Sequence, residues 1–322
     1  MSRVLVVAEQ QGGVPHKMTL ETLAAGQGVG GELVVAVMGE GAAQAAGVLA
    51  GYRASKVVVL EHPALGAYTA AATVAALQWM IGAEKPDLVL MPHTYQTRDF
   101  APRLAARLAR PLVSDVVSVG RDEQGMVCER QLFQGKMTGR FRVDAGGLAI
   151  LTIQAGAYRA EQAETGQTQV SHATPEIGEA SAGAVPAAPY RETAGTVDLS
   201  AAERIVAVGR GIREEGNLGV VEELARALGA ELAASRPICD NGWLGMERQV
   251  GSSGQTVAPK LYVAVGISGA IQHIVGMKGS KCVVAINKDA EAPIFEAADY
   301  GIVGDLFEVV PAIVEELRKA GA

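Results

Sequence analysis

Residues 261–277, LYVAVGISGAIQHIVGM, place a bare turn directly after an apolar run. The run is expected to form a buried strand, and Gly266 allows the chain to leave that strand sharply. Ser268 is well placed as the N-cap of a following helix, where its hydroxyl would accept a hydrogen bond from a free backbone N–H. Gly269 and Ala270 carry almost no side chain, so a ligand can approach the first-turn amides. Such amides form an anion site that suits a pyrophosphate.

A histidine follows this turn. Gly269 and His273 are four residues apart, so they share one face of a helix. Gln272 and His273 lie off the apolar stripe that is expected to face the sheet, which consists of Ile267, Ile271, Ile274 and Val275. His273 is therefore expected to overlook a ligand at the helix N-terminus. The simpler alternative is a capped tight turn followed by a partly exposed helix histidine.

Polar residues follow the other apolar runs of the second half. Arg210 lies in a glycine turn, where a guanidinium can pair with phosphate, although it could equally be a surface arginine. Ser235 and Arg236 follow a short strand. An arginine over a flavin ring would favour its anionic reduced forms, whereas an interdomain salt bridge is the simpler interpretation. Asn287 could be a mere turn residue, and Asp305 is expected to cap the last helix.

The glycine spacing bears on the kind of nucleotide site. Gly209 and Gly211 lack a glycine three residues later, and Gly266 and Gly269 do not have the GxGxxG spacing either. An ordinary hydride-transferring dinucleotide site is therefore disfavoured.

Strands and helices alternate in both halves, which predicts an α/β protein with two doubly wound domains, the C-terminal one Rossmann-like. The expected domains are residues 1–160 and 199–322. Residues 161–198 are rich in Ala, Gly, Thr, Glu and Pro, so an extended linker is expected there. Four short runs after Pro111 resemble antiparallel additions to the first sheet: VSDVVSV, MVCERQLF, GRFRVD and LAILTI.

The composition excludes several classes of protein. The net charge of −7 over 322 residues argues against a nucleic-acid face or an anionic membrane surface. Cys128, Cys239 and Cys282 are scattered and lack zinc spacing. No run approaches the ~18 apolar residues of a membrane span, so no membrane insertion is expected. A strand begins almost at residue 1 and no signal or transit segment precedes it, which predicts a cytoplasmic protein.

The segment 257–311, VAPKLYVAVGISGAIQHIVGMKGSKCVVAINKDAEAPIFEAADYGIVGDLFEVVP, resembles the signature region of the electron transfer flavoprotein α subunits. VGRGIREEGN and ASRP upstream also match, and PHTYQTRDFAPRLAARL in the first half is similar more loosely. The resemblance covers the whole chain and is tightest over residues 204–311.

This resemblance implies a heterodimer with a β subunit on which residues 1–160 pack. It implies one FAD held by the C-terminal domain and AMP in the β subunit. Electrons would arrive from acyl-CoA or related dehydrogenases, as in fatty acid β-oxidation. They would leave to a quinone oxidoreductase or another acceptor, via an anionic flavin semiquinone. The chain would then be a carrier and not an enzyme.

The resemblance also assigns roles by position. Arg210 would contact FAD, and Ser235 and Arg236 would flank the isoalloxazine. His273 would lie near the flavin pyrimidine oxygen and Asn287 at the ribityl–phosphate region. Asp305 and Leu306 would hold the adenosine end. The residues that would wrap the flavin and pyrophosphate are Ser268, Gly269, Ala270, Ile271, Gln272 and His273.

One departure from the family pattern concerns the loop before Val257. Many members have Val-Gly-Gln-Thr where this chain has Val250, Gly251, Ser252 and Ser253. Ser253 keeps a hydroxyl at the position implied to lie near flavin N5, and Ser252 lacks the amide. Two other functions stay open: an NAD-dependent oxidoreductase, and a non-redox adenine-nucleotide binding module, which the first half alone could be.

Overall fold

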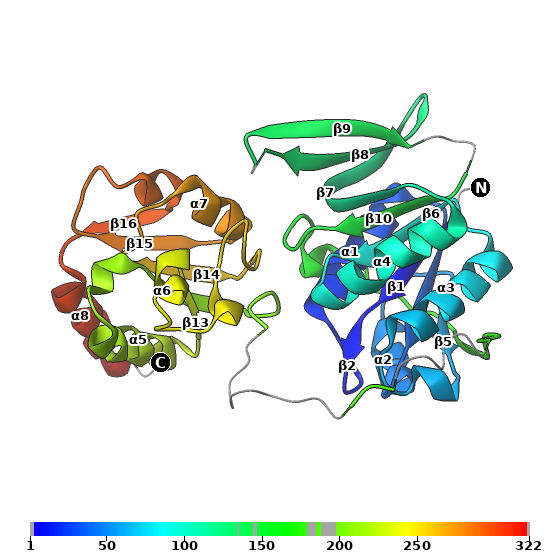
Figure 1. The fold of residues 1–322 in the computed structure, drawn as a ribbon, viewed down its shortest axis with the longest axis horizontal. Helices are drawn as coiled ribbons and strands as arrows, with labels where there is room; N and C mark the ends of the chain where they lie inside the picture. The colour runs from blue at the N-terminus through cyan, green and yellow to red at the C-terminus, as the bar shows by residue number, and fades with distance from the viewer. Residues whose placement is uncertain (1–2, 134, 144–146, 179–184, 188–197, 321–322) are drawn as a thin grey trace. The chain divides into compact units, whose positions relative to one another are not determined.

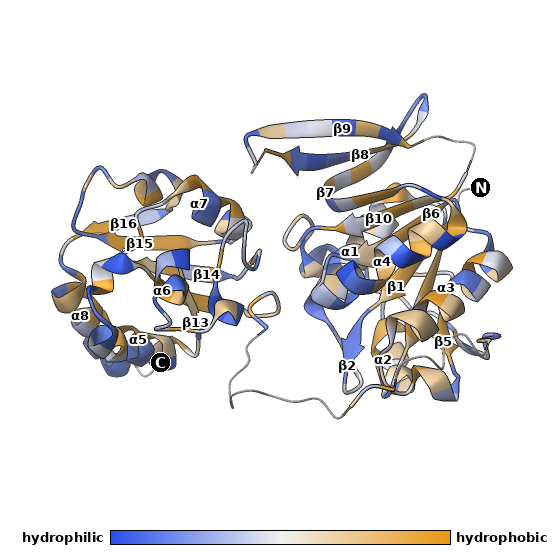
Figure 2. Ribbon diagram, viewed as in Figure 1, coloured by the Kyte–Doolittle hydropathy of each residue, from blue (hydrophilic) through white to orange (hydrophobic). Residues whose placement is uncertain are grey.

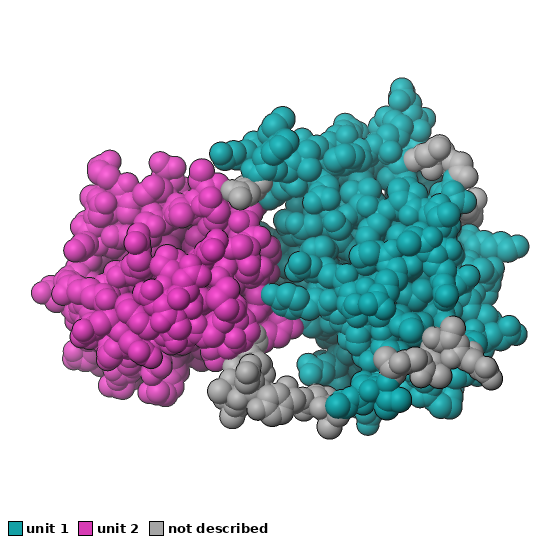
Figure 3. All heavy atoms as spheres, viewed as in Figure 1, with its two compact units in different colours: residues 1–190 teal, residues 191–322 magenta. Residues whose placement is uncertain are grey.

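The computed structural model describes residues 3–133, 135–143, 147–178, 185–187 and 198–320 (Figure 1). The chain divides into two compact units, Met1–Tyr190 and Arg191–Ala322, which Figure 3 shows in different colours. Each unit has an apolar sheet with helices around it, as the hydropathy colouring in Figure 2 shows. The expected α/β class is therefore confirmed. None of the helices described here is long and apolar enough to cross a membrane.

The first unit contains a nine-stranded mixed sheet in the order β11-β5-β4-β1-β6-β10-β7-β8-β9. Its strands are β1 (Arg3–Ala8), β4 (Glu32–Met38), β5 (Lys56–Leu60), β6 (Leu88–Pro92), β7 (Leu112–Asp122), β8 (Gly125–Leu132), β9 (Met137–Val143), β10 (Ala149–Ile153) and β11 (Val170–Ala173). The short strands β2 (Gln10–Gln11) and β3 (Val14–Pro15) form a separate hairpin. One face of the sheet packs on α1 (Lys17–Val29) and α2 (Ala42–Leu49), and the other on α3 (Ala70–Glu84) and α4 (Tyr95–Leu108).

Two expectations about this unit are wrong. The run LAILTI was expected as an antiparallel addition, but β10 is a fully buried strand that pairs in parallel with both β6 and β7. Within the described part of the nine-stranded sheet, the antiparallel pairs are β7 with β8 and β8 with β9. The expected linker, residues 161–198, includes β11, whose backbone pairs in parallel with β5 at the sheet edge. Residues 179–184 and 188–197 of that linker lie outside the described residues.

The second unit has a five-stranded, wholly parallel sheet in the order β13-β12-β14-β15-β16. The strands are β12 (Arg204–Val208), β13 (Glu231–Ala234), β14 (Leu261–Val265), β15 (Val283–Asn287) and β16 (Tyr300–Val303). Alternate strand residues point to opposite faces and form two cores. One core includes α5 (Leu218–Leu228), α6 (Arg236–Asp240) and α8 (Leu306–Lys319), and the other includes α7 (Ile271–Met277) and the 3-10 helix η7 (Pro293–Ala297).

Candidate functional site

The strand order of the second unit creates a crevice at one point. The chain passes from β12 to β13 on one side and then returns to β14 on the other side of β12. Ligands of open parallel sheets bind where the strand order reverses in this way, outside the carboxyl ends of the strands. Here the two strand ends are followed by Gly209 and Gly266. The crevice between β12 and β14 is therefore the candidate site.

Glycines let the two turns at this crevice touch. A Cβ on Gly209 would lie 2.7 Å from the Ile267 Cα and closer still to the Gly266 carbonyl oxygen. A Cβ on Gly211 would lie 2.7 Å from the Gly266 Cα. The backbones are bonded to each other, since the Gly211 N–H donates to the Gly266 carbonyl at 3.0 Å. Gly266 itself has φ +63°, a conformation that favours glycine. The turns therefore form a cradle of bare backbone.

The segment after Gly266 differs from the expectation. Helix α7 begins at Ile271, its N-cap is Ala270, and no side chain caps it, so the predicted N-cap role of Ser268 is wrong. Gly269 takes φ +86°, which keeps this segment out of the helix. As a result, the backbone N–H groups of Ser268, Gly269 and Ala270 donate no hydrogen bond within the described part of the chain. They are available to an anionic ligand.

The end of β15 and the 3-10 helix η7 hold this loop in place. The Asn287 side chain at the end of β15 donates from Nδ2 to the Ile267 carbonyl at 2.9 Å. The Ile294 N–H donates to the Ser268 carbonyl at 3.2 Å. A Cβ on Gly269 would lie 2.6 Å from the Ile294 Cα, so the loop can lie there only with glycine at this position. Asn287 thus has a positioning contact and is more than a turn residue.

His273 lies inside the protein, and the expected orientation of its helix is wrong. His273 is 5 % exposed, whereas Ile271, which was expected to face the sheet, is 51 % exposed. The imidazole Nε2 lies 2.9 Å from the Tyr262 hydroxyl of β14. Burial lowers the pKa of His273 to about 4, and a hydrogen-bonding interaction with the Val250 backbone partly opposes this shift. The ring is therefore neutral at pH 7.

Residues 250–253 run beside α7. The Ser252 N–H donates to the Gln272 carbonyl at 2.8 Å. A Cβ on Gly276 would lie 2.5 Å from the Gly251 Cα, so the two backbones are in close contact. The Ser253 hydroxyl accepts a hydrogen bond from the Gln249 side chain at 2.9 Å. Within the described part of the chain, three buried polar atoms of this region have no partner at hydrogen-bond distance: Gln249 Oε1, Gln255 Oε1 and His273 Nδ1.

Two arginines lie at the same sheet edge. Arg210 is exposed and forms no ion pair with the residues described. Arg236 forms an exposed ion pair with Asp240, at 3.2 Å between Nε and Oδ2. Both partners of that pair lie on α6. Ser235, just before Arg236, is buried and makes no side-chain capping bond.

The residues at the start of α8 are the last candidates at this edge of the sheet. Asp305 accepts a hydrogen bond from the Phe307 N–H at 3.0 Å, which confirms its predicted N-cap role. This bond is the main cause of its lowered pKa, and Arg213 contributes through an ion pair at 2.8 Å. Leu306 is buried beside Gly266. Arg213, which the sequence did not single out, also stacks over the Phe307 ring at 4.8 Å.

Comparison with known proteins decides the family. The electron transfer flavoprotein domain matches residues 4–188, and the electron transfer flavoprotein FAD-binding domain matches residues 198–278. The electron transfer flavoprotein subunit alpha of Bacillus subtilis is 39 % identical over 98 % of both chains. That of Mycobacterium tuberculosis is 39 % identical over 99 % of both chains.

The chain belongs to the electron transfer flavoprotein α-subunit family. A further relative, from Anaerotignum propionicum, is 34 % identical over 98 % of this chain and 95 % of its own, and is named acryloyl-CoA reductase electron transfer subunit beta. The matched FAD-binding domain includes β12, β14 and α7, and hence the glycine cradle and His273. The free amides, the exposed Arg210 and the unpartnered imidazole nitrogen fit a phosphate-linked ring cofactor such as FAD.

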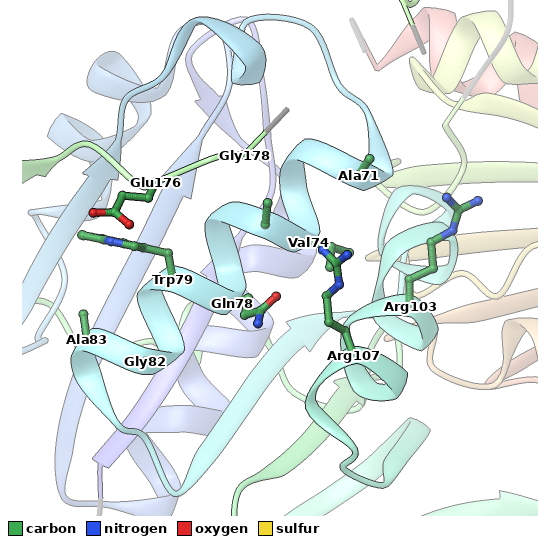
Figure 4. Close-up of a pocket in the computed structure, with 11 residues that line it drawn as sticks. Ala71, Val74, Gln78, Trp79, Gly82, Ala83, Arg103, Arg107, Glu176 and Gly178 are labelled. Carbon is green, nitrogen blue, oxygen red and sulfur yellow. The ribbon is translucent and has the colours of Figure 1, made fainter. Parts of the chain in front are cut away.

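A hollow of a different kind lies in the first unit. A groove of about 800 Å³ runs between α3 and α4 of the first unit (Figure 4). Its floor is mostly small apolar side chains, with Trp79 on one side and Arg103 and Arg107 on α4. Helix sides line it, with part of the segment after β11, and no strand end contributes. No sequence pattern predicted this groove, which is formed by helix sides and not by turns at strand ends.

A small pocket of about 30 Å³ lies at the carboxyl end of β1 in the first unit. A hydrogen bond between Thr94 and Glu9 closes this edge. Such a volume accommodates about one water molecule.

Proposed function

We propose that the chain is the FAD-carrying subunit of an electron carrier. It would accept electrons from dehydrogenases of the acyl-CoA type and pass them to a quinone oxidoreductase or another acceptor, via an anionic flavin semiquinone. The observation that carries this proposal is the glycine cradle with its free amides at the β12/β14 crevice, inside the matched FAD-binding domain. The parallel sheet with this crevice supports a Rossmann-like description of the second unit.

The phosphate end of FAD is assigned to the cradle. The free N–H groups of Ser268, Gly269 and Ala270 would donate to pyrophosphate oxygens, as amides do in other anion sites. Arg210 adds a positive charge that is not neutralised by a described partner. Asn287 keeps the loop in place through the Ile267 carbonyl. Asp305 and Leu306 are assigned to the adenosine end.

The ring end is assigned to α6, α7 and residues 250–253. When bound, FAD supplies the chemistry of electron uptake and release. The protein supplies hydrogen-bond donors and charge, which favour negatively charged reduced forms of the ring. Arg236, Ser253 and His273 are the proposed tuning residues. Ser235, Val250, Gly251, Ser252, Ile271 and Gln272 are proposed to line the cofactor.

The first unit offers a surface for the partner subunit. Apolar side chains at the β8–β9 arm face solvent: Phe133 is 71 % exposed, Met137 is 59 % exposed and Phe141 is 37 % exposed. Large exposed apolar side chains grouped in this way mark protein interfaces. We assign the arm to the electron transfer flavoprotein β subunit, which would hold AMP. A cytoplasmic location and a carrier role without a small-molecule substrate are part of this proposal.

The first experiment is to co-produce the chain with a β subunit and record the visible spectrum during stepwise dithionite reduction. A flavin spectrum that passes through a red anionic semiquinone is expected. A colourless protein that takes up no added FAD would overturn the proposal. Bound NAD with hydride transfer would favour an oxidoreductase instead. The double variant Arg103→Ala/Arg107→Ala, in the groove of the first unit, is the control, and its FAD content should equal that of the wild type.

A further inference from the structure

Tyr262 and His273 form a polar pair in the core of the second unit. Tyr262, in β14, is 0 % exposed and His273 is 5 % exposed. The Tyr262 hydroxyl oxygen lies 2.9 Å from His273 Nε2, and the rings meet edge to face with centroids 6.2 Å apart. The other ring nitrogen, Nδ1, is buried and has no hydrogen-bond partner among the described residues.

The position of the imidazole proton follows from counting donors and acceptors. Burial keeps both groups neutral at pH 7, because it lowers the pKa of His273 to about 4 and raises that of Tyr262. A neutral imidazole carries one proton, on either Nε2 or Nδ1. Nε2 is the one polar partner of the Tyr262 hydroxyl within the described chain.

Suppose first that Nε2 carries the proton and donates to the Tyr262 oxygen. The phenol proton then has no acceptor, and the Nδ1 lone pair has no donor. In the other arrangement the phenol donates to Nε2, and only the Nδ1–H is left without a partner. A buried polar group without a partner destabilises the folded state, so the second arrangement, which leaves fewer such groups, is favoured.

We propose that Tyr262 is a positioning residue: by donating to Nε2, it holds the His273 proton on Nδ1 and presents that N–H to the flavin ring. The imidazole lies beside the loop 250–253, because a hydrogen-bonding interaction with the Val250 backbone raises the pKa of His273 and Gly251 lies beside the His273 Cα. This loop is the one assigned to the ring. The role in flavin binding rests on the proposed function, whereas the proton position does not.

The test is ¹⁵N NMR of the full chain labelled at the histidine ring nitrogens. His273→Gln identifies the His273 signals by their loss. In the wild type, Nδ1 should give the shift of a protonated nitrogen and Nε2 that of an unprotonated one. Tyr262→Phe keeps the ring but removes the donor, so the tautomer ratio should move toward Nε2–H by about tenfold. Tyr300→Phe, at an exposed tyrosine of β16, should change nothing.

A wild-type His273 protonated on Nε2 would overturn the proposal, even if Tyr262→Phe did not fold. An unchanged tautomer ratio in folded Tyr262→Phe would overturn it as well. In the FAD-loaded heterodimer, Tyr262→Phe should lower the reduction potential while FAD content stays constant, because a donor to the ring is lost. An unchanged potential would remove the link to the flavin. A colourless wild type would refute the proposed function and leave the tautomer result valid.

Discussion

Gly209→Ala tests whether the contact between the two glycine turns is required for FAD binding. The added methyl group would lie 2.7 Å from the Ile267 Cα and closer to the Gly266 carbonyl oxygen. Both neighbours are backbone atoms, so neither can move aside by rotating a side chain. The turn at Gly266 would have to shift, and the free amides that follow it would shift as well.

Inserting a methyl group into a well-packed site typically costs about 1–3 kcal/mol. If the same free energy is lost from cofactor binding, FAD affinity falls by about fivefold to somewhat over a hundredfold, since about 1.4 kcal/mol corresponds to a factor of ten. Urea unfolding measures the change in stability. Fluorescence of flavin released on dilution measures the change in affinity.

Gly219→Ala is the matched control for this substitution. Gly219 is exposed on α5, and a Cβ there would meet nothing within 4 Å. Alanine is a better helix residue than glycine by up to about 1 kcal/mol, so stability should be unchanged or slightly higher. FAD affinity should equal that of the wild type. The cradle argument would be refuted if Gly209→Ala bound FAD as tightly as Gly219→Ala and were equally stable.

Three further predictions concern charge. The free energy of unfolding should fall as pH drops from about 6.5 toward 4, by up to about 1.4 kcal/mol per pH unit, because the unfolded chain binds a proton that buried His273 resists. Denaturant titrations should show a shallower fall in His273→Gln. Arg236→Ala should lower the flavin reduction potential, whereas Arg318→Ala, which breaks an equally exposed ion pair, should not. Arg107→Glu, which reverses the charge of one residue in the groove between α3 and α4, should leave FAD content unchanged, because that groove lies in the first unit.

The features that the sequence predicted best depend on local chemistry. Asp305 caps α8 because its carboxylate reaches an N–H only two residues away. The strand ends that carry Arg210 and Asn287 follow from apolar runs, and parallel pairing brings those ends to one edge. In contrast, the place of β10 between β6 and β7, and the pairing of β11 with β5, depend on partners distant in sequence. Alternation within one run carries no information about such partners.

The orientation of α7 shows why the site itself was only partly predictable. The expected buried positions included 271, 274 and 275, whereas the observed ones are 273, 276 and 277, so the stripe keeps its spacing but starts two residues later. Two residues rotate a helix by about 200°, which exchanges the buried and exposed faces. Because isoleucine is apolar, the sequence pattern predicted that the isoleucines of this helix would be buried. The face that is buried carries Gly276, whose missing side chain lets α7 approach the backbone of Gly251. Close backbone packing therefore decides the rotation of α7. This rotation places His273 against Tyr262, where the protein, and not solvent, sets the position of the imidazole proton.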